Sequence, residues 1–389
     1  MSSLIMLSPA PLVELAGGEI VLDVRFVEGM KLHCQLWPGP VRVVMRRRPL
    51  PIDFPMRYAV AKLGFDLIVL DRGAPVPDLL LDEAAMIYAA ADDLQYLDLP
   101  RRMRGRMGKL VFTVDESMSG RIAQSLAQTS SLRRRLGAVW WNLRNERALR
   151  AALRQADGTQ FNGYPAWRAY RGCNPHHLRF FDSRIRAPMI VRAAEQEARA
   201  QALRRGDPLR LVWFGALTPE SGAEDLLRMA HLLDSRRLPF SLEIRGDGEL
   251  APRLQAGIEA LGLAGRVTLA PIPPFDPVLV PRLRKEADVF VSARRLSTPV
   301  SSYLEAMGCG LPVLGYGNAM WSRMQAESGG GWAVRRRPGA LAAAVERLHA
   351  QREEVIEASA RAADFARANA FETAFARRMN DLRDIAGVE

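Results

Sequence analysis

The amino-acid sequence predicts an α/β protein with two Rossmann-like, doubly wound domains. Three observations support this class. Apolar runs of strand length alternate with helical stretches through both halves of the chain. A length of 389 residues is enough for two domains with full-sized cores. A charged segment that is poor in apolar residues, at 185–208, separates the two halves.

The first half is predicted as one domain over residues 1–200, and its alternation begins with a helix at 26–37. Strands are predicted at 41–46, 65–71 and 109–114, where short apolar runs are separated by helical stretches. Continuous apolar runs are typical of strands that are buried on both faces. The pattern therefore indicates a mostly parallel sheet covered by helices.

The second half is predicted as a domain over 208–368 and repeats this plan more regularly. A strand at 210–215 is followed by a helix that Ser221 and Glu224 open. Further strands are predicted in the sequences "FSLEIR", "RVTLAP", "ADVFVSA" and "LPVLGY". Doubly wound folds bind ligands at the carboxyl ends of such strands. A helix within 369–389 is expected to pack back toward the N-terminal domain.

The net charge of +11 is the unusual bulk property, and nearly all of the basic residues are arginines. A positive surface attracts nucleic acid, anionic lipid or phosphorylated substrates. A GC-rich genome would explain the arginine bias equally well. Because no nucleic-acid-binding motif accompanies the charge, no nucleic-acid partner is expected.

The sequence also predicts where the protein works. No apolar run approaches the roughly 20 residues that span a bilayer. The first residues lack the basic and apolar regions of a signal peptide. The three cysteines, Cys34, Cys173 and Cys309, lie far apart, without metal-binding spacing or an even number for disulfides. We therefore expect a reduced, cytoplasmic protein.

The stretch "STPVSSYLEAMGCGLPVLGY" at 297–316 is the first candidate site. It places Ser301, Ser302 and Glu305 at the start of a predicted helix. A helix N-terminus presents unpaired N–H groups and partial positive charge, which favour phosphate. The alternative is a capping box formed by Ser302 and Glu305, which requires no ligand.

Four motifs of the second half, in this order, resemble those of a known family: "FGALTPESGAEDLLRMA", "LEIRGDGE", "ADVFVSAR" and "SYLEAMGCGLPVL". They are similar to the donor domain of GT-B glycosyltransferases, in particular the large retaining group that includes glycogen-synthase-like and bacterial polysaccharide enzymes. The resemblance covers residues 208–335. It implies two domains that face a cleft and a nucleotide-sugar co-substrate, most often linked to UDP.

The resemblance also implies roles for individual residues. Glu305 would bind the ribose hydroxyls, and Ser301 and Ser302 would offer backbone N–H groups to the diphosphate. Gly215 would leave room for the sugar phosphate, and Gly246 would shape a turn near the nucleotide. The base would lie at the loop 271–275, and the loop before Ser301 would add Ser297 and Thr298 to the donor site.

Three charged groups of that family are replaced in this chain. Ser297 stands in place of a Glu that contacts the donor sugar, and Ala216 and Ser221 stand in place of cations that neutralise the diphosphate. We expect Arg294 and Arg295 to compensate, since a preorganised Arg stabilises a leaving diphosphate well. A solvated loop is the alternative for these two arginines, and a binding module without catalysis is the alternative for the whole chain.

Acceptor-side candidates come from the first half. Asp115 and Glu116 follow the strand at 109–114, and their carboxylates could hold or deprotonate a hydroxyl. Capping of the next helix by Asp115 or Ser117 is the alternative. Glu28 and Gly29, near the start of a helix, form a second candidate pair.

Residues 131–154 combine clustered arginines with tryptophans at helical spacing. A basic amphipathic helix of this kind suits an anionic membrane interface. The alternative is a core-facing helix with a charged outer face. If the helix contacts the membrane, the acceptor is expected to be lipid-linked, on the inner face of the cytoplasmic membrane.

These observations together predict a hexosyltransferase that moves a sugar from a nucleotide-sugar to a saccharide or lipid-linked acceptor, in bacterial polysaccharide, exopolysaccharide or glycolipid synthesis. The resemblance implies retention of configuration. No Asp-x-Asp element is present, and Asp247 and Glu249 suit a turn better than a metal site. No metal and no cofactor besides the nucleotide-sugar are expected.

Overall fold

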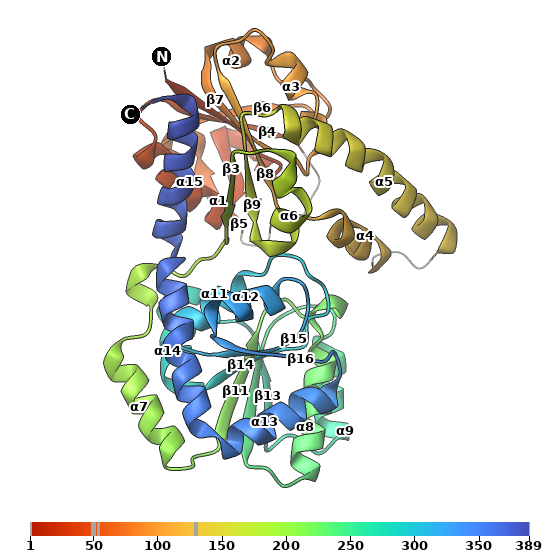
Figure 1. Cartoon of the computed structure of the whole chain (residues 1–389), viewed down its shortest axis with the longest axis vertical. Helices are drawn as coiled ribbons and strands as arrows, with labels where there is room; N and C mark the ends of the chain where they lie inside the picture. The colour runs from red at the N-terminus through yellow and green to blue at the C-terminus, as the bar shows by residue number, and fades with distance from the viewer. Residues whose placement is uncertain (1, 48–51, 53–54, 128–130, 389) are drawn as a thin grey trace. The chain divides into compact units, whose positions relative to one another are not determined.

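The computed structural model describes residues 2–47, 52, 55–127 and 131–388, and the chain divides into two compact units (Figure 1). The first unit comprises Met1–Phe180 together with Ala374–Glu389, and the second comprises Phe181–Thr373. The expectation of two parallel-sheet α/β domains is confirmed, because the main sheet of each unit is parallel throughout its described pairings.

The main sheet of the first unit has seven described strands in the order β10-β9-β8-β7-β1-β4-β6. Its inner strands are the apolar runs that the sequence marks, and their buried side chains include Ile5, Val44, Ile87 and Phe112. Neighbouring strands pair in parallel, for example with Leu4 opposite Val41. The strands are β1 (Ser3–Leu7), β4 (Val41–Arg46), β6 (Asp66–Leu70), β7 (Ala84–Ala90), β8 (Lys109–Val114), β9 (Gly158–Asn162) and β10 (His177–Phe180).

A small antiparallel sheet of β2 (Val13–Glu14), β3 (Glu19–Asp23) and β5 (Pro55–Ala59) accompanies this main sheet. The sequence does not predict it, because its strands are short and mostly exposed. Asp23 ends β3 and caps the next helix, α1 (Val24–Leu36), by accepting a hydrogen bond from the backbone N–H of Arg25 at 2.8 Å. This cap explains why the helix begins slightly before the predicted 26–37.

The helices of the first unit vary in length. They are α1, α2 (Asp78–Glu83), α3 (Leu99–Arg102), α4 (Met118–Ala127), α5 (Leu132–Gln155), α6 (Gly163–Tyr170) and most of α15 (Phe371–Ala386). In Figure 1 the N-terminal half of α5 extends away from the sheet of its own unit, with α4 alongside it.

Helix α15 joins the first unit through contacts far apart in sequence. The ring of Phe375 meets the ring of buried His33 edge-on, with centroids 4.6 Å apart. The buried side-chain amide of Gln160 donates to the carboxylate of Asp381 at 2.8 Å and to the carbonyl of Arg378 at 3.0 Å. A buried amide needs such partners, so α15 completes the core of this unit.

The second unit has a sheet of six described strands in the order β13-β12-β11-β14-β15-β16. The strand order reverses between the two central strands, β11 and β14. In doubly wound sheets this reversal opens a crevice at the carboxyl ends, where ligands bind. The strands are β11 (Leu209–Phe214), β12 (Phe240–Arg245), β13 (Val267–Ala270), β14 (Val289–Ser292), β15 (Val313–Tyr316) and β16 (Gly331–Val334).

Eight described helices cover this sheet. They are α7 (Ala193–Arg204), α8 (Ala223–Ser235), α9 (Ala251–Ala260), α10 (Val280–Glu286), α11 (Ser301–Gly308), α12 (Trp321–Ser328), α13 (Pro338–Ala350) and α14 (Arg352–Ala368).

The division of the chain falls at Phe180, before the charged segment that the sequence marks as the separator. That segment contains α7, which is held in the second unit by the buried side chain of Arg199. Its guanidinium donates to the carbonyls of Ala287, Gly310 and Cys309 at 2.6–3.0 Å. Burial lowers the pKa of Arg199 to about 10. The sequence does not distinguish a buried arginine from a solvated one. The first domain was therefore predicted to extend to residue 200, beyond the boundary at Phe180.

Candidate functional site

The carboxyl edge of the second unit's sheet is built largely from backbone. The loop after β11 is pinned to the turn after β12, because the N–H of Gly215 donates to the carbonyl of Arg245 at 3.0 Å and that of Leu217 to Asp247 at 2.9 Å. A β-carbon on Gly246 would overlap the carbonyl oxygen of Gly215. Glycine at this position therefore permits the close approach of the two loops.

Helix α8 begins beside the loop that follows β14. Gly222, with a φ of 74°, precedes the helix, and a β-carbon there would overlap the carbonyl oxygen of Ala293. The hydroxyl of buried Ser221 accepts a hydrogen bond from the N–H of Ala223 at 3.2 Å. The structure thus brings Gly215, Gly246 and the loop containing Arg294 to one edge, at the reversal of strand order.

Arg294 and Arg295 differ in their partners. Arg294 donates to the hydroxyl of Thr298 at 2.5 Å, and its buried Nε has no hydrogen-bond partner in the described structure. Arg295 is exposed and pairs with buried Asp225 at 2.7 Å. The charge of Arg295 is thus offset, whereas Arg294 retains an unused buried donor. The phenol of Tyr316 also donates to Asp225, and burial beside that carboxylate raises the pKa of Tyr316.

The loop leads into α11, and no side chain among the described residues caps this helix start. Val300 is the residue before the helix, and Ser301 and Ser302 are its first two residues. The capping-box alternative for Ser302 and Glu305 is therefore wrong, because Ser302 lies inside the helix. The hydroxyl of Ser297 accepts from the N–H of Ala319 at 3.0 Å, which fixes the loop at its other side.

Glu305 is 1% exposed and forms a two-pronged ion pair with Arg184, which sequence reasoning missed. Nε of Arg184 lies 2.8 Å from one carboxylate oxygen and Nη2 lies 3.2 Å from the other. The same guanidinium lies 4.0 Å from the ring centroid of Phe275, in the loop where the resemblance places the base. Arg184 therefore links the expected ribose-binding carboxylate to the expected base-binding loop.

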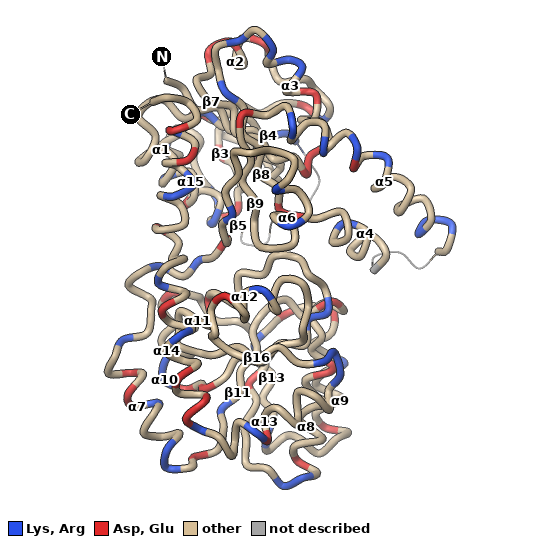
Figure 2. The backbone as a smooth tube through the Cα atoms, in the orientation of Figure 1, with Lys and Arg blue, Asp and Glu red and all other residues tan. Residues whose placement is uncertain are grey.

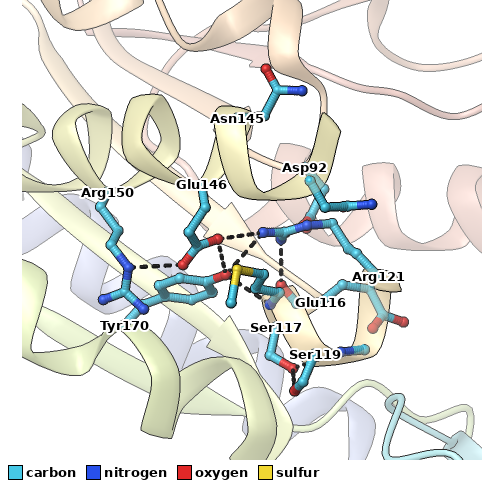
Figure 3. A network of polar contacts seen from close by, with 12 residues as sticks. Asp92, Glu116, Ser117, Ser119, Arg121, Asn145, Glu146, Arg150 and Tyr170 are labelled. Carbon is cyan, nitrogen blue, oxygen red and sulfur yellow. Dashed lines mark hydrogen bonds and ion pairs between the residues drawn. The ribbon is translucent and has the colours of Figure 1, made fainter. Parts of the chain in front are cut away.

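The carboxyl edge of the first unit holds a partly buried polar cluster, shown in Figure 3. Asp115 follows β8, and its backbone N–H donates to the carboxylate of Asp92 at 2.6 Å. Asp92 lies just after β7. Burial, and then the charge of Asp115, raise the pKa of Asp92 to about 7.

Arg121 in α4 joins the members of this cluster (Figure 3). Its guanidinium lies 2.7 Å from the carboxylate of Glu146 and 3.4 Å from that of Asp92, and it donates to the phenol oxygen of Tyr170 at 3.0 Å. The phenol in turn donates to Glu146 at 2.9 Å. Chiefly because it is buried, Tyr170 has a pKa of about 12. We name Asp92, Arg121, Glu146 and Tyr170 the Arg121 cluster.

The sequence-predicted acceptor residues separate into two groups. Asp115 is exposed and Glu116 half-buried, and both flank the Arg121 cluster. Ser117 provides the capping interaction of α4, because its hydroxyl accepts from the N–H of Gly120 at 3.2 Å. Glu28 pairs with its own helix neighbour, Lys31.

Gly29 lies inside α1, where a β-carbon would sit 3.8 Å from the ring of Phe375. It therefore faces α15, and its carbonyl accepts a hydrogen bond from the ring of His33. Neither Glu28 nor Gly29 contributes a recorded contact to the Arg121 cluster in the described part of the chain. Across the same residues, no group of three His, Cys, Asp or Glu side chains is arranged to hold a metal ion.

Residues 208–351 match the family model described as "Glycosyl transferases group 1". A relative in Streptomyces fradiae, 2-deoxystreptamine N-acetyl-D-glucosaminyltransferase, is 33% identical over 131 residues. This match covers 33% of the chain and 30% of the relative's length. The residues that match the family model include all six strands of the second unit's sheet, β11 to β16.

Solved structures match the fold across nearly the whole chain. Anabaena HepE in complex with UDP and glucose has a TM-score of 0.65 at 14% identity, covering 98% of each chain. Sucrose-phosphate synthase from Thermosynechococcus elongatus has a TM-score of 0.63 at 17% identity, covering 99% of this chain and 98% of its own. WaaG, a glycosyltransferase involved in lipopolysaccharide biosynthesis, has a TM-score of 0.59 at 13% identity, covering 97% and 98%. The fold is that of the GT-B glycosyltransferases.

Proposed function

We propose, from the premise that residues 208–351 form a glycosyl transferase group 1 domain, that the protein transfers a hexose from a nucleotide-sugar to a saccharide acceptor. The observation that carries this proposal is the carboxyl edge of the second unit. Arg294, with its unused buried Nε, and the uncapped start of α11 both offer donors at the point where the strand order reverses. The UDP complex of Anabaena HepE supports UDP as the nucleotide.

In this proposal the second unit binds the donor and stabilises the leaving group. The bond between the anomeric carbon and the diphosphate breaks, and the diphosphate keeps the electron pair. Arg294 and the N–H groups at Ser301 and Ser302 stabilise its growing charge. They would replace the cations absent at Ala216 and Ser221, so we propose transfer without a metal.

The first unit would hold the acceptor. Asp115 is exposed at the end of β8 and fixed through its backbone by Asp92, so it is the carboxylate suited to orient an acceptor hydroxyl and to take its proton. Glu116 would support it. The acceptor oxygen then bonds to the anomeric carbon, and we propose retention of configuration as in the retaining group.

The finer identity of the reaction is also part of the proposal. We propose bacterial polysaccharide, exopolysaccharide or glycolipid synthesis, with a saccharide or lipid-linked saccharide acceptor in the cytoplasm, at its membrane. The WaaG resemblance in fold is compatible with a glycolipid acceptor. No cofactor besides the nucleotide-sugar enters the proposed reaction.

Calorimetric titration with UDP, GDP and ADP, followed by the sugar conjugates of whichever binds, tests the donor site. We expect UDP to bind and Arg294→Ala to weaken it about 10- to 100-fold, since a charge-assisted hydrogen bond contributes about 1.5–3 kcal/mol. Arg236→Ala removes an exposed arginine directly after α8 that pairs with Glu346, and it serves as the control. Equal weakening by both variants, or no nucleotide binding, would overturn the proposal.

A binding module without catalysis is the second candidate, and the engagement of Glu305 by Arg184 favours it. Transfer of radiolabelled sugar from the donor to a bacterial lipid extract distinguishes the two. Transfer that disappears in Asp115→Asn, while UDP binding stays unchanged, would eliminate the silent module. Donor binding with no transfer to any acceptor fraction would favour it.

A further inference from the structure

Helix α5 changes character along its length. Its buried residues are Asn142, near the middle of the helix, and Glu146, Leu149, Ala152 and Leu153 beyond it. The N-terminal part instead carries exposed large apolar side chains, at Leu132, Leu136, Trp140, Trp141 and Leu143. The core-facing alternative is therefore wrong for the first half of this helix.

Four of these apolar residues form one stripe. Leu132, Leu136, Trp140 and Leu143 follow one another at steps of four, four and three, which places them on one face of a helix. Trp140 is 61% exposed. Trp141 is 50% exposed, but it lies about 100° round the helix from Trp140 and therefore outside the stripe. A contiguous apolar stripe of this size on a surface marks an interaction site.

The charge around the stripe is of one sign. Residues 131–145 contain no acidic residue, and Glu146, just beyond them, is buried and paired with Arg121. Among the described residues, no ion pair involves the exposed arginines of this part of α5. These arginines are Arg133, Arg134, Arg135, Arg144 and Arg147. The guanidinium of Arg144 lies 5.5 Å from the ring centroid of Trp140, so charge and apolar surface are interleaved. Blue segments mark the free end of α5 in Figure 2.

We propose that this surface, residues 131–147, docks on an anionic lipid bilayer. Tryptophan side chains prefer the boundary between headgroups and acyl chains, and leucines reach the acyl region beside them. Arginines on the flanks extend to the phosphates, and anionic lipids attract them. Nucleic acid would match the arginines but leave the leucine stripe in water.

The attachment is peripheral. Among the described residues no helix is both long and apolar enough to cross a membrane. Helix α4 packs along α5, and the C-terminal half of α5 is anchored in the core of the first unit. The docking surface is thus held on a fixed support, and its use requires no unfolding of the unit.

Co-sedimentation of the full chain with vesicles tests the proposal. One set of vesicles is pure phosphatidylcholine, and the other contains about 30% phosphatidylglycerol. The second set is included because anionic lipid attracts a basic protein surface. The variant Arg133→Gln/Arg134→Gln/Arg135→Gln removes charge, and Trp140→Ser/Trp141→Ser removes the rings. The matched control is Arg335→Gln/Arg336→Gln/Arg337→Gln, a second run of three exposed arginines without an apolar stripe.

We expect binding to the anionic vesicles alone, weakened about tenfold or more by each α5 variant and unchanged by the control, and reduced by salt. Circular dichroism checks that the exposed substitutions leave the fold intact. Absence of binding, or equal weakening by the control, would overturn the proposal. Self-association abolished by Trp140→Ser/Trp141→Ser, without vesicle binding, would instead assign the surface to a second copy of the chain.

Discussion

The two units present opposite kinds of carboxyl edge. In the second unit the edge is made of close backbone contacts at glycines, a helix start and ion pairs such as those of Glu305 with Arg184 and of Asp225 with Arg295. In the first unit the edge is filled by the Arg121 cluster, in which buried Glu146 and partly buried Arg121 and Asp92 pair with one another. The edge of the second unit, built from backbone, leaves hydrogen-bond donors free for a ligand. The Arg121 cluster of the first unit instead fixes the turn that carries the exposed carboxylate of Asp115.

The largest expected effect is the loss of stability when Arg121 is removed from the carboxyl edge of the first unit. Arg121→Met removes one of the two guanidinium groups that pair with the buried carboxylate of Glu146, while Arg150 remains at 2.8 Å. We expect a loss of about 3 kcal/mol, at the lower end of the range for breaking a buried ion pair. Hydrogen exchange of the amides in β7 and β8 measures this loss separately from the second unit. Arg147→Met, on an exposed position of α5, is the control and should change the opening free energy little.

The next largest expected effect is the change in stability of the first unit with pH, to which Asp92 contributes. Asp92 has a pKa of about 7 when folded, so between pH 4 and 7 the native state keeps a proton that the unfolded state has released. The Asp92 contribution to stability therefore falls as the pH rises, by roughly 1.4 kcal/mol per pH unit.

The contribution of His33 to stability changes with pH in the opposite direction. Burial, with the charge of Arg378, lowers its pKa to about 3, so between pH 3 and 6.5 the unfolded state binds the proton and stability rises with pH. We expect the two contributions to offset each other in the first unit. Asp92→Asn should leave stability rising from pH 4 to 6.5, measured by denaturant titration at each pH. A profile that still falls with pH in this variant would contradict the assignment.

We expect a bound nucleotide to displace Arg184 from Glu305 in the second unit. Because Arg184 occupies both carboxylate oxygens of Glu305, the ribose hydroxyls of a nucleotide would compete with it. We expect Arg184→Met to bind UDP about tenfold more tightly, a change of about 1.4 kcal/mol, by calorimetry. Weaker binding would mean that Arg184 itself contacts the nucleotide. Arg186→Met, two residues away and paired with Asp276, is the control.

The smallest effect concerns the backbone contacts. Gly246→Ala would push the turn after β12 away from Gly215, at an expected cost of about 1 kcal/mol in stability. In the described part of the chain, no atom lies within 4 Å of a β-carbon added to Gly265, so Gly265→Ala is the matched control. Thermal unfolding that is the same for both variants would show that the two loops yield without strain.

The sequence predicted the two-domain α/β fold, because buried parallel strands leave continuous apolar runs. The resemblance of its motifs to those of GT-B glycosyltransferases pointed to Gly215 and Gly246, and the stretch 297–316 pointed to Glu305. Their roles in donor binding stay a prediction. The Arg121 cluster could not be predicted, because Asp92, Arg121 and Glu146 are brought together only by strand order. The acidic pair directly after β7 was the available signal. Arg184 and Arg199 were missed for the same reason: nothing local distinguishes a buried arginine from a solvated one.

The return of α15 to the first unit has a consequence for synthesis. A ribosome must complete all of Phe181–Thr373 before it makes the residues that cover His33 and satisfy Gln160. The second unit is continuous and can fold as it emerges, whereas the first waits with part of its core open. The first unit leaves the ribosome before the second, but its core stays incomplete for longer. Nascent chains of this protein are therefore expected to bind chaperones through the first unit.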